Sequence, residues 1–112
     1  MAVAFTVNVT PSVGEWKIVD AYSTDVGTAQ TLITAVAGHK IYVKSITINL
    51  LATDRWVKIF DGVTLRIGPV EPRSQIWSVR YESPMVFSGN VTVQTESDKE
   101  IHITMCYRIY PG

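Results

Sequence analysis

The chain has 112 residues with ten basic and ten acidic side chains, which gives a formal net charge of zero. We expect one domain over residues 1–112, and the balanced charge excludes the electrostatic footprint of a nucleic-acid binder. The hydrophobic fraction is 46%, and chains near zero net charge tend to associate, so we expect apolar surface to contact a partner.

Cysteine content and apolar runs indicate the compartment. Cys106 is the only cysteine, so no intrachain disulfide can form, which argues against a disulfide-stapled secreted module. Residues 1–9 lack the basic and long apolar regions of a signal peptide. No apolar run approaches the ~20 residues of a membrane helix. We expect a protein made and folded in a reducing cytoplasm, without membrane insertion.

Three strand-like segments open the chain. Val3 to Val9 places larger apolar residues at every second position and is followed by Pro11, as in an amphipathic strand at a sheet edge. The short link 11–14 favours pairing with the next strand, Trp16 to Tyr22, within the same sandwich. Addition to a neighbour's edge stays open as the alternative. Ala29 to Ala37 is a weaker strand.

Alternation of apolar and polar residues continues through the middle of the chain. Lys40 to Leu51 and Arg55 to Phe60 are typical of half-buried strands and are interpreted as a strand pair joined at Asp54. The inward parity of the first changes between Val43 and Ile46, and one extra residue there would act as a β-bulge.

A tight turn is predicted where the next strand begins. Asp61-Gly62 favours a type I′ hairpin, because both central residues tolerate positive φ. The short strand Val63 to Ile67 follows it and ends at Gly68-Pro69.

The second half of the chain contains four further strand-like segments. They are Gln75 to Tyr81, Met85 to Phe87, Val91 to Thr95 and Ile101 to Ile109. In the first we expect Ile76 and either Val79 or Tyr81 to face inward, and Ser83-Pro84 to end the strand. The last is the longest uninterrupted alternation in the chain, which predicts a central strand.

The whole pattern predicts an all-β fold. About nine or ten short strands, separated by turns, are typical of an antiparallel β-sandwich. We expect a jelly-roll or closely related topology.

Residues with catalytic or metal-binding chemistry are few and dispersed. His39 and His102 lie on different predicted elements, and two histidines are fewer ligands than a zinc site needs. Turn chemistry explains Asp61 and Asp98 without catalysis. Cys106 has the parity opposite to its apolar neighbours, which favours a small packed thiol. We predict no enzyme activity, no cofactor and no metal site.

Large aromatic side chains are the main candidates for a binding surface. Trp56, Phe60 and Tyr42 fall on parities opposite to their apolar neighbours, and Trp77 adjoins Ile76. Three interpretations stay open: a subunit interface, a second core covered by a loop, and a platform for sugar stacking.

The run Ala35-Val36-Ala37-Gly38, followed by Ile41-x-Val43-x-Ser45-Ile46, resembles the start of small jelly-roll virion proteins of tailed phages and related viruses. The similarity extends over roughly residues 30–110 and includes Asp61-Gly62, Ile67-Gly68-Pro69, Pro84-Met85-x-Phe87-Ser88-Gly89 and the closing strand Ile101 to Tyr110. The chain departs from the family pattern at Glu71-Pro72-Arg73, where a glycine-rich loop is usual.

The resemblance implies a non-enzymatic virion structural protein of the head-decoration or fibre type, self-associating and often trimeric. Its expected partners are copies of itself and a capsid or tail protein. The alternative function is a carbohydrate- or receptor-binding β-sandwich module, in which the aromatic side chains would contact a glycan.

Overall fold

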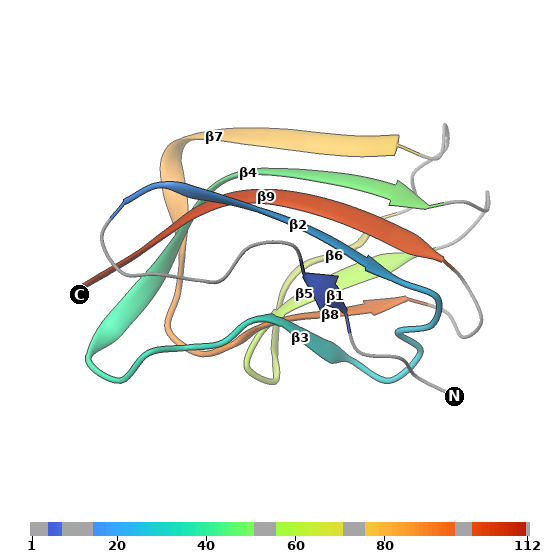
Figure 1. Ribbon diagram of the computed structural model, residues 1–112, viewed down its shortest axis with the longest axis horizontal. Helices are drawn as coiled ribbons and strands as arrows, with labels where there is room; N and C mark the ends of the chain where they lie inside the picture. Colours follow the sequence, from blue (N-terminus) through green and yellow to red (C-terminus); the bar gives the residue numbers. More distant parts are fainter. Residues whose placement is uncertain (1–4, 8–14, 51–55, 71–75, 96–99, 112) are drawn as a thin grey trace.

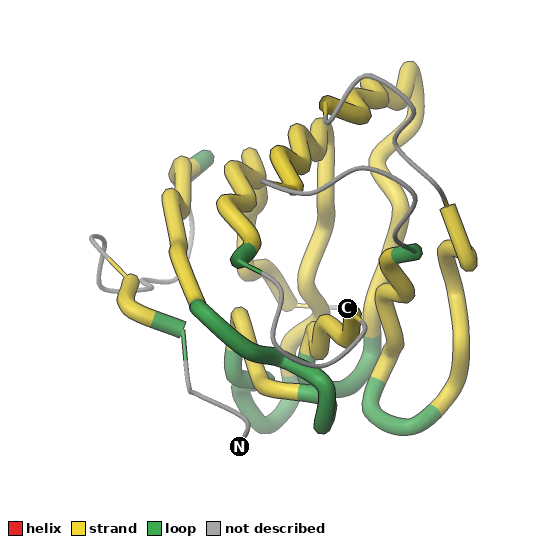
Figure 2. The backbone as a smooth tube through the Cα atoms, turned by 90° about the vertical axis from the view of Figure 1, so that its right-hand side faces the viewer, coloured by secondary structure: helices red, strands yellow, loops and turns green. Residues whose placement is uncertain are grey.

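A computed structural model describes residues 5–7, 15–50, 56–70, 76–95 and 100–111. Nine strands lie within these residues: β1 (Thr6–Val7), β2 (Lys17–Ser23), β3 (Gln30–Ile33), β4 (His39–Leu50), β5 (Val57–Asp61), β6 (Thr64–Val70), β7 (Ile76–Phe87), β8 (Val91–Thr95) and β9 (Ile101–Pro111). The described part contains strands and loops and no helix (Figure 2). The expected all-β fold is confirmed.

The strands form two antiparallel sheets that pack as a sandwich. Sheet A has the order β1-β2-β9-β4-β7 and sheet B the order β3-β8-β5-β6. Figure 1 shows β7, β4, β9 and β2 in the upper layer and β6, β5, β8 and β3 in the lower one. Four antiparallel pairs, β5·β6, β4·β7, β3·β8 and β2·β9, nest around the β5–β6 turn. The chain is therefore arranged as one long hairpin folded across both sheets.

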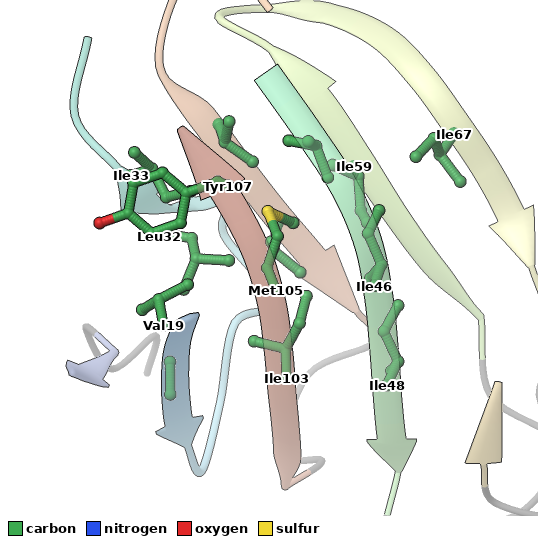
Figure 3. Packing of buried hydrophobic residues seen from close by; sticks show 14 of the residues in the cluster. Val19, Leu32, Ile33, Ile46, Ile48, Ile59, Ile67, Ile103, Met105 and Tyr107 are labelled. Carbon is green, nitrogen blue, oxygen red and sulfur yellow. The ribbon is translucent and has the colours of Figure 1, made fainter. Parts of the chain in front are cut away.

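Alternation along β9 builds the centre of the core. Its odd-numbered residues from Ile101 to Ile109 are all buried, and the strand lies between β2 and β4. Figure 3 shows Met105 and Ile103 of β9 beside Ile46 and Ile48 of β4, their partners in the ladder. The predicted central position of this strand is confirmed.

The expected β-bulge in β4 is also confirmed. The register of β4 with both β7 and β9 shifts between Val43 and Ser45. The shift returns Ile46 to the inner face, because one extra residue restores the parity that two consecutive polar residues interrupt.

One predicted strand pairing was wrong. The segments Lys40 to Leu51 and Arg55 to Phe60 supply consecutive strands, β4 and β5, but these lie in different sheets and do not pair. Asp54, the expected joint, is outside the described residues. Local alternation shows that a segment is half-buried and carries no information on which sheet it joins.

The predicted break at Ser83-Pro84 was also wrong, because β7 runs without interruption from Ile76 to Phe87. Since β7 is an edge strand, a proline without an N–H donor is tolerated there. Residues 81–84 also fall where the register with β4 shifts, so the proline interrupts no ladder pair. In this strand Ile76 points outward with 59% of its surface exposed, and Trp77, Val79 and Tyr81 pack on the core. The prediction of an inward Ile76 was wrong by one position.

The β5–β6 turn is displaced by one residue from its predicted position. Asp61 pairs with Thr64, so Gly62 and Val63 are the loop residues. Gly62 has a φ of 62°, which suits the first central position of a primed hairpin turn. Asp61 is the last residue of β5, where it pairs with Thr64 and Val91, and its carboxylate accepts hydrogen bonds from the neighbouring β7–β8 turn.

The N-terminal strand pairs within its own sandwich. Thr6 lies opposite Tyr22 and Val7 opposite Ala21, so β1 forms one edge of sheet A. This agrees with the favoured prediction. Phe5, just before β1, packs against the core, and residues 3–4 and 8–9 of the predicted strand lie outside the described part of the chain.

Candidate functional site

The structure places the four predicted aromatic residues in three different environments. Tyr42 has the outward parity of β4 on sheet A, because its neighbours Ile41 and Val43 are buried. Trp56 and Phe60 have the outward parity of β5 on sheet B. Trp77 packs against the core. A single site formed by these four side chains is therefore not present.

Tyr42 belongs instead to an aromatic groove on the outer face of sheet A. This aromatic groove is lined by Trp16, Tyr42, Pro84, Arg108 and Tyr110, and its volume is about 160 Å³.

Strand register explains why these residues meet. Tyr42 lies opposite Arg108, and Lys40 lies opposite Tyr110, in the β4–β9 ladder. Trp16 directly precedes β2, the other neighbour of β9, and keeps 39% of its surface exposed. Tyr110 is 45% exposed. The groove thus has aromatic walls that a ligand can reach.

Arg108 is the central polar group of the aromatic groove. Its guanidinium carbon lies 3.9 Å from the centre of the Tyr110 ring and 6.0 Å from that of Trp16. The Lys44 ammonium lies 5.4 Å from the same Trp16 ring. Such cation–π contacts fix the cation over the ring and leave its hydrogen-bonding edge for other partners. Nε of Arg108 is buried and has no hydrogen-bond partner within the described residues.

A second hollow lies farther along the same outer face and is polar. This polar trough is lined by Asp20, Thr47, Asn49, Ile76, His102 and Thr104, with a volume of about 310 Å³. Thr104 Oγ1 donates to Asp20 Oδ1 at 3.3 Å, and the Tyr22 and His102 rings lie 4.5 Å apart between centroids with their planes tilted by 54°. Desolvation, with the charge of Glu100 and a hydrogen bond to it, raises the pKa of Tyr22. The trough offers hydrogen-bonding groups on an open surface.

Asp61 has a structural role at one end of the sandwich. Its carboxylate accepts hydrogen bonds from Gly89 N at 2.6 Å and Ser88 N at 3.0 Å. Arg66 lies 3.4 Å from the same carboxylate and donates to Val86 O at 2.7 Å. Turn chemistry thus explains Asp61, as expected, although the turn is the one between β7 and β8.

The two histidines and the cysteine do not converge. His39 Nδ1 lies 3.0 Å from Ala37 O at the start of β4, and His102 lies beside Tyr22 near the other end of sheet A. Cys106 is a half-buried free thiol on β9. Within the described ranges no group of three or more histidine, cysteine, aspartate or glutamate side chains is arranged to hold a metal ion.

Comparison of the sequence with protein-family models and with curated proteins found no match. The part of the chain that the structure describes contains no helix able to cross a membrane.

Sequence reasoning missed Trp16, Arg108 and Tyr110 as members of one site. Each has the outward parity of its strand or strand end, and the alternation in the sequence is enough to show this. Their proximity depends on the order β2-β9-β4, and residues so far apart in the chain give no local signal of it.

Proposed function

We propose that this chain is a jelly-roll protein that serves as a non-enzymatic structural component of a virion and associates with copies of itself. A jelly roll has eight strands in two sheets. Strands β2 to β9 supply that number, and their nested pairing around the β5–β6 turn supports the topology. The resemblance of residues 30–110 to small virion proteins supports the role.

Exposed apolar residues on the β5–β6 hairpin are the observation that carries self-association. Val63 at the turn is 96% exposed and Leu65 on β6 is 44% exposed. Leu65 pairs with Phe60, which shares the outward parity of β5 with Trp56. We call these four residues the assembly face. A second copy of the chain is the proposed partner, because burial of this face would remove apolar surface from water and the neutral chain lacks a repelling charge.

The test of self-association is the mass in solution by light scattering at micromolar concentration. The wild type should be a homo-oligomer, with a trimer as the expected state, and the double variant Val63→Ser, Leu65→Glu should be a monomer. Ile18→Glu, on the outer face of sheet A, is the control and should keep the oligomer. A monomeric wild type, or a double variant that keeps its mass, would contradict the proposal.

The virion role has its own experiment. An antibody against this chain should label purified particles of the virus that encodes it in electron microscopy. Particles without label, with the protein found only in the lysate, would contradict a structural role in the virion.

A second candidate function is glycan recognition, and the aromatic groove favours it. Sugar-binding surfaces need accessible aromatic rings beside hydrogen-bonding groups, and Trp16, Tyr110 and Arg108 supply both. This face lies on the opposite side of the sandwich from the assembly face, so the two roles are compatible. Binding of any oligosaccharide at the groove would support it.

A further inference from the structure

The volume of the aromatic groove is suited to one ring of a ligand. Pockets for drug-sized ligands measure about 300–1,000 Å³, whereas this groove measures about 160 Å³. Its walls are the rings of Trp16, Tyr42 and Tyr110 with the pyrrolidine of Pro84. A ring-sized ligand with one apolar face matches such walls.

The charge of the aromatic groove is positive. Arg108 lines it, Lys44 lies over Trp16, and Lys40 is the ladder partner of Tyr110. No carboxylate lines the groove, and within the described residues none forms an ion pair with any of these three cations. The ligand that complements them carries a negative charge.

Arg108 determines what kind of negative group fits. Its guanidinium carbon lies 3.9 Å from the centre of the Tyr110 ring, and its Nε has no hydrogen-bond partner in the described part of the chain. A guanidinium is planar and presents its N–H groups in that plane, which matches the two oxygens of a carboxylate.

From these observations we infer that the aromatic groove binds the carboxylated pyranose of an acidic glycan, such as a uronic or sialic acid residue. This inference rests on the proposed glycan-recognition role and names its ligand class. The pyranose ring would lie against the aromatic walls, and its carboxylate would accept hydrogen bonds from Arg108, with Lys44 and Lys40 adding to the attraction.

Two other occupants fit the face less well. A nucleic-acid strand continues beyond one ring and carries a negative charge at each phosphate. Beyond the groove, the outer face of sheet A carries Asp20 and leads to Glu100, and these acidic residues do not suit a chain of phosphates. A second protein copy would need a standard interface of about 800 Å² per partner, which extends far beyond a groove of this size. A single carboxylated pyranose needs neither a path for a continuing strand nor a large interface.

The chain contains built-in reporters for the test. Its three tryptophans lie at the groove (Trp16), on the outer face of sheet B (Trp56) and against the core (Trp77). Each indole N–H gives a separate NMR signal, and Arg108 contributes an Nε–H signal. The titrations use sialyllactose with lactose, and a glucuronic-acid disaccharide with its glucose counterpart, as matched acidic and neutral probes. An oligothymidylate is the third probe.

The acidic sugars should shift the Trp16 indole and Arg108 Nε–H signals and leave those of Trp56 and Trp77 in place. Arg108→Gln should weaken acidic-sugar binding by about tenfold or more, because hydrogen bonds to a charged group contribute more to affinity than those between neutral groups. Trp16→Ala should weaken it by about tenfold. Trp56→Ala is the matched control and should leave the affinity unchanged. Melting temperatures of all variants establish that each is folded, and the signal shifts in the wild type do not depend on any variant.

The outcomes separate this inference from the function on which it rests. Equal binding of acidic and neutral sugars at Trp16 would overturn the ligand class and keep glycan recognition. The absence of sugar binding would overturn both. Oligothymidylate binding at Trp16, or an acidic-sugar affinity that Arg108→Gln does not change, would also overturn the inference.

Discussion

At the scale of single residues, the carboxylate of Asp61 joins two turns that are distant in sequence. It accepts hydrogen bonds from the backbone of Ser88 and Gly89 and lies beside Arg66. A Cβ atom at Gly89 would lie 3.0 Å from Asp61 Oδ1, so the turn approaches the carboxylate as closely as a glycine allows. This carboxylate is therefore one of the groups that hold the end of the sandwich together, with Asn90, whose Oδ1 accepts a hydrogen bond from Ala35 N at 2.7 Å.

We therefore expect Asp61→Ala to destabilise the protein. The variant leaves two backbone donors without their acceptor, and each such loss costs about 1–3 kcal/mol when the group is buried. Because the site is partly exposed and water can replace some of the bonds, we expect a loss of about 2 kcal/mol in urea unfolding. Glu15→Ala, at an exposed carboxylate, is the control. Equal stability of the two variants would show that the Asp61 contacts do not stabilise the fold.

Tyr107 illustrates the opposite case, in which a polar group is buried without compensation. The residue is fully buried, and its hydroxyl has no hydrogen-bond partner within the described residues. Tyr107→Phe keeps the packed ring, so we expect stability to stay the same or to rise by about 1 kcal/mol in urea unfolding. Tyr110→Phe, on the outer face, should change nothing. A clear loss of stability in Tyr107→Phe would contradict the absence of a partner.

The same burial predicts how alkaline pH acts on stability. Desolvation by burial raises the pKa of Tyr107 above the ordinary tyrosine value of about 10. As pH rises, the tyrosine of the unfolded chain therefore ionises before that of the folded protein. This ionisation favours unfolding, so the free energy of unfolding is unaffected below about pH 10 and decreases as pH rises above it. We expect the urea midpoint of the wild type to fall more steeply than that of Tyr107→Phe between about pH 9 and about pH 11. Parallel curves would contradict a raised pKa.

At the scale of elements, alternation predicts β8 and β9 well and β7 poorly. Val91 to Thr95 and Ile101 to Ile109 have one buried face each, and every second residue is buried; all of these are apolar except Thr95. The bulge in β4 was predictable for the same reason, because the parity change is visible in the sequence. The continuity of β7 through Pro84 was not, since it depends on the strand's position at the sheet edge. An alternation of apolar and polar residues indicates which side chains are buried, but it does not determine which strands are neighbours.

The N-terminal strand leads to a prediction at this scale. β1 pairs with β2 and forms the edge of sheet A, so its removal would leave β2 with unpaired backbone groups at a new edge. We expect deletion of residues 1–10 to lower the melting temperature or to change the mass in solution. Pro11→Ala is the matched control, because it leaves the strand in place. Unchanged melting temperature and mass in the truncated protein would show that the strand is an accessory tail.

At the scale of the whole molecule, the sandwich separates two kinds of exposed aromatic surface. The aromatic groove lies on sheet A, and the assembly face lies on sheet B and its hairpin. The sequence predicted that outward aromatics exist and named Tyr42, Trp56 and Phe60 among them. It could not assign them to two sides, because that division follows from which strands share a sheet, and strands as distant as β2 and β9 are neighbours.

This separation predicts that assembly and ligand binding can be changed independently. The monomeric double variant Val63→Ser, Leu65→Glu should bind an acidic sugar in solution with the affinity of the wild type, because neither residue lines the aromatic groove. On a surface coated with the same sugar, the oligomer should bind more tightly than the monomer, since linked sites raise the effective concentration and avidity gains of about 10²–10⁴ are attainable. NMR titration measures the first affinity and surface plasmon resonance the second. Arg108→Gln is the reciprocal control and should keep the mass of the oligomer while losing binding in both measurements. A double variant that loses affinity in solution would show that the groove depends on the oligomer, and the two faces would then act together.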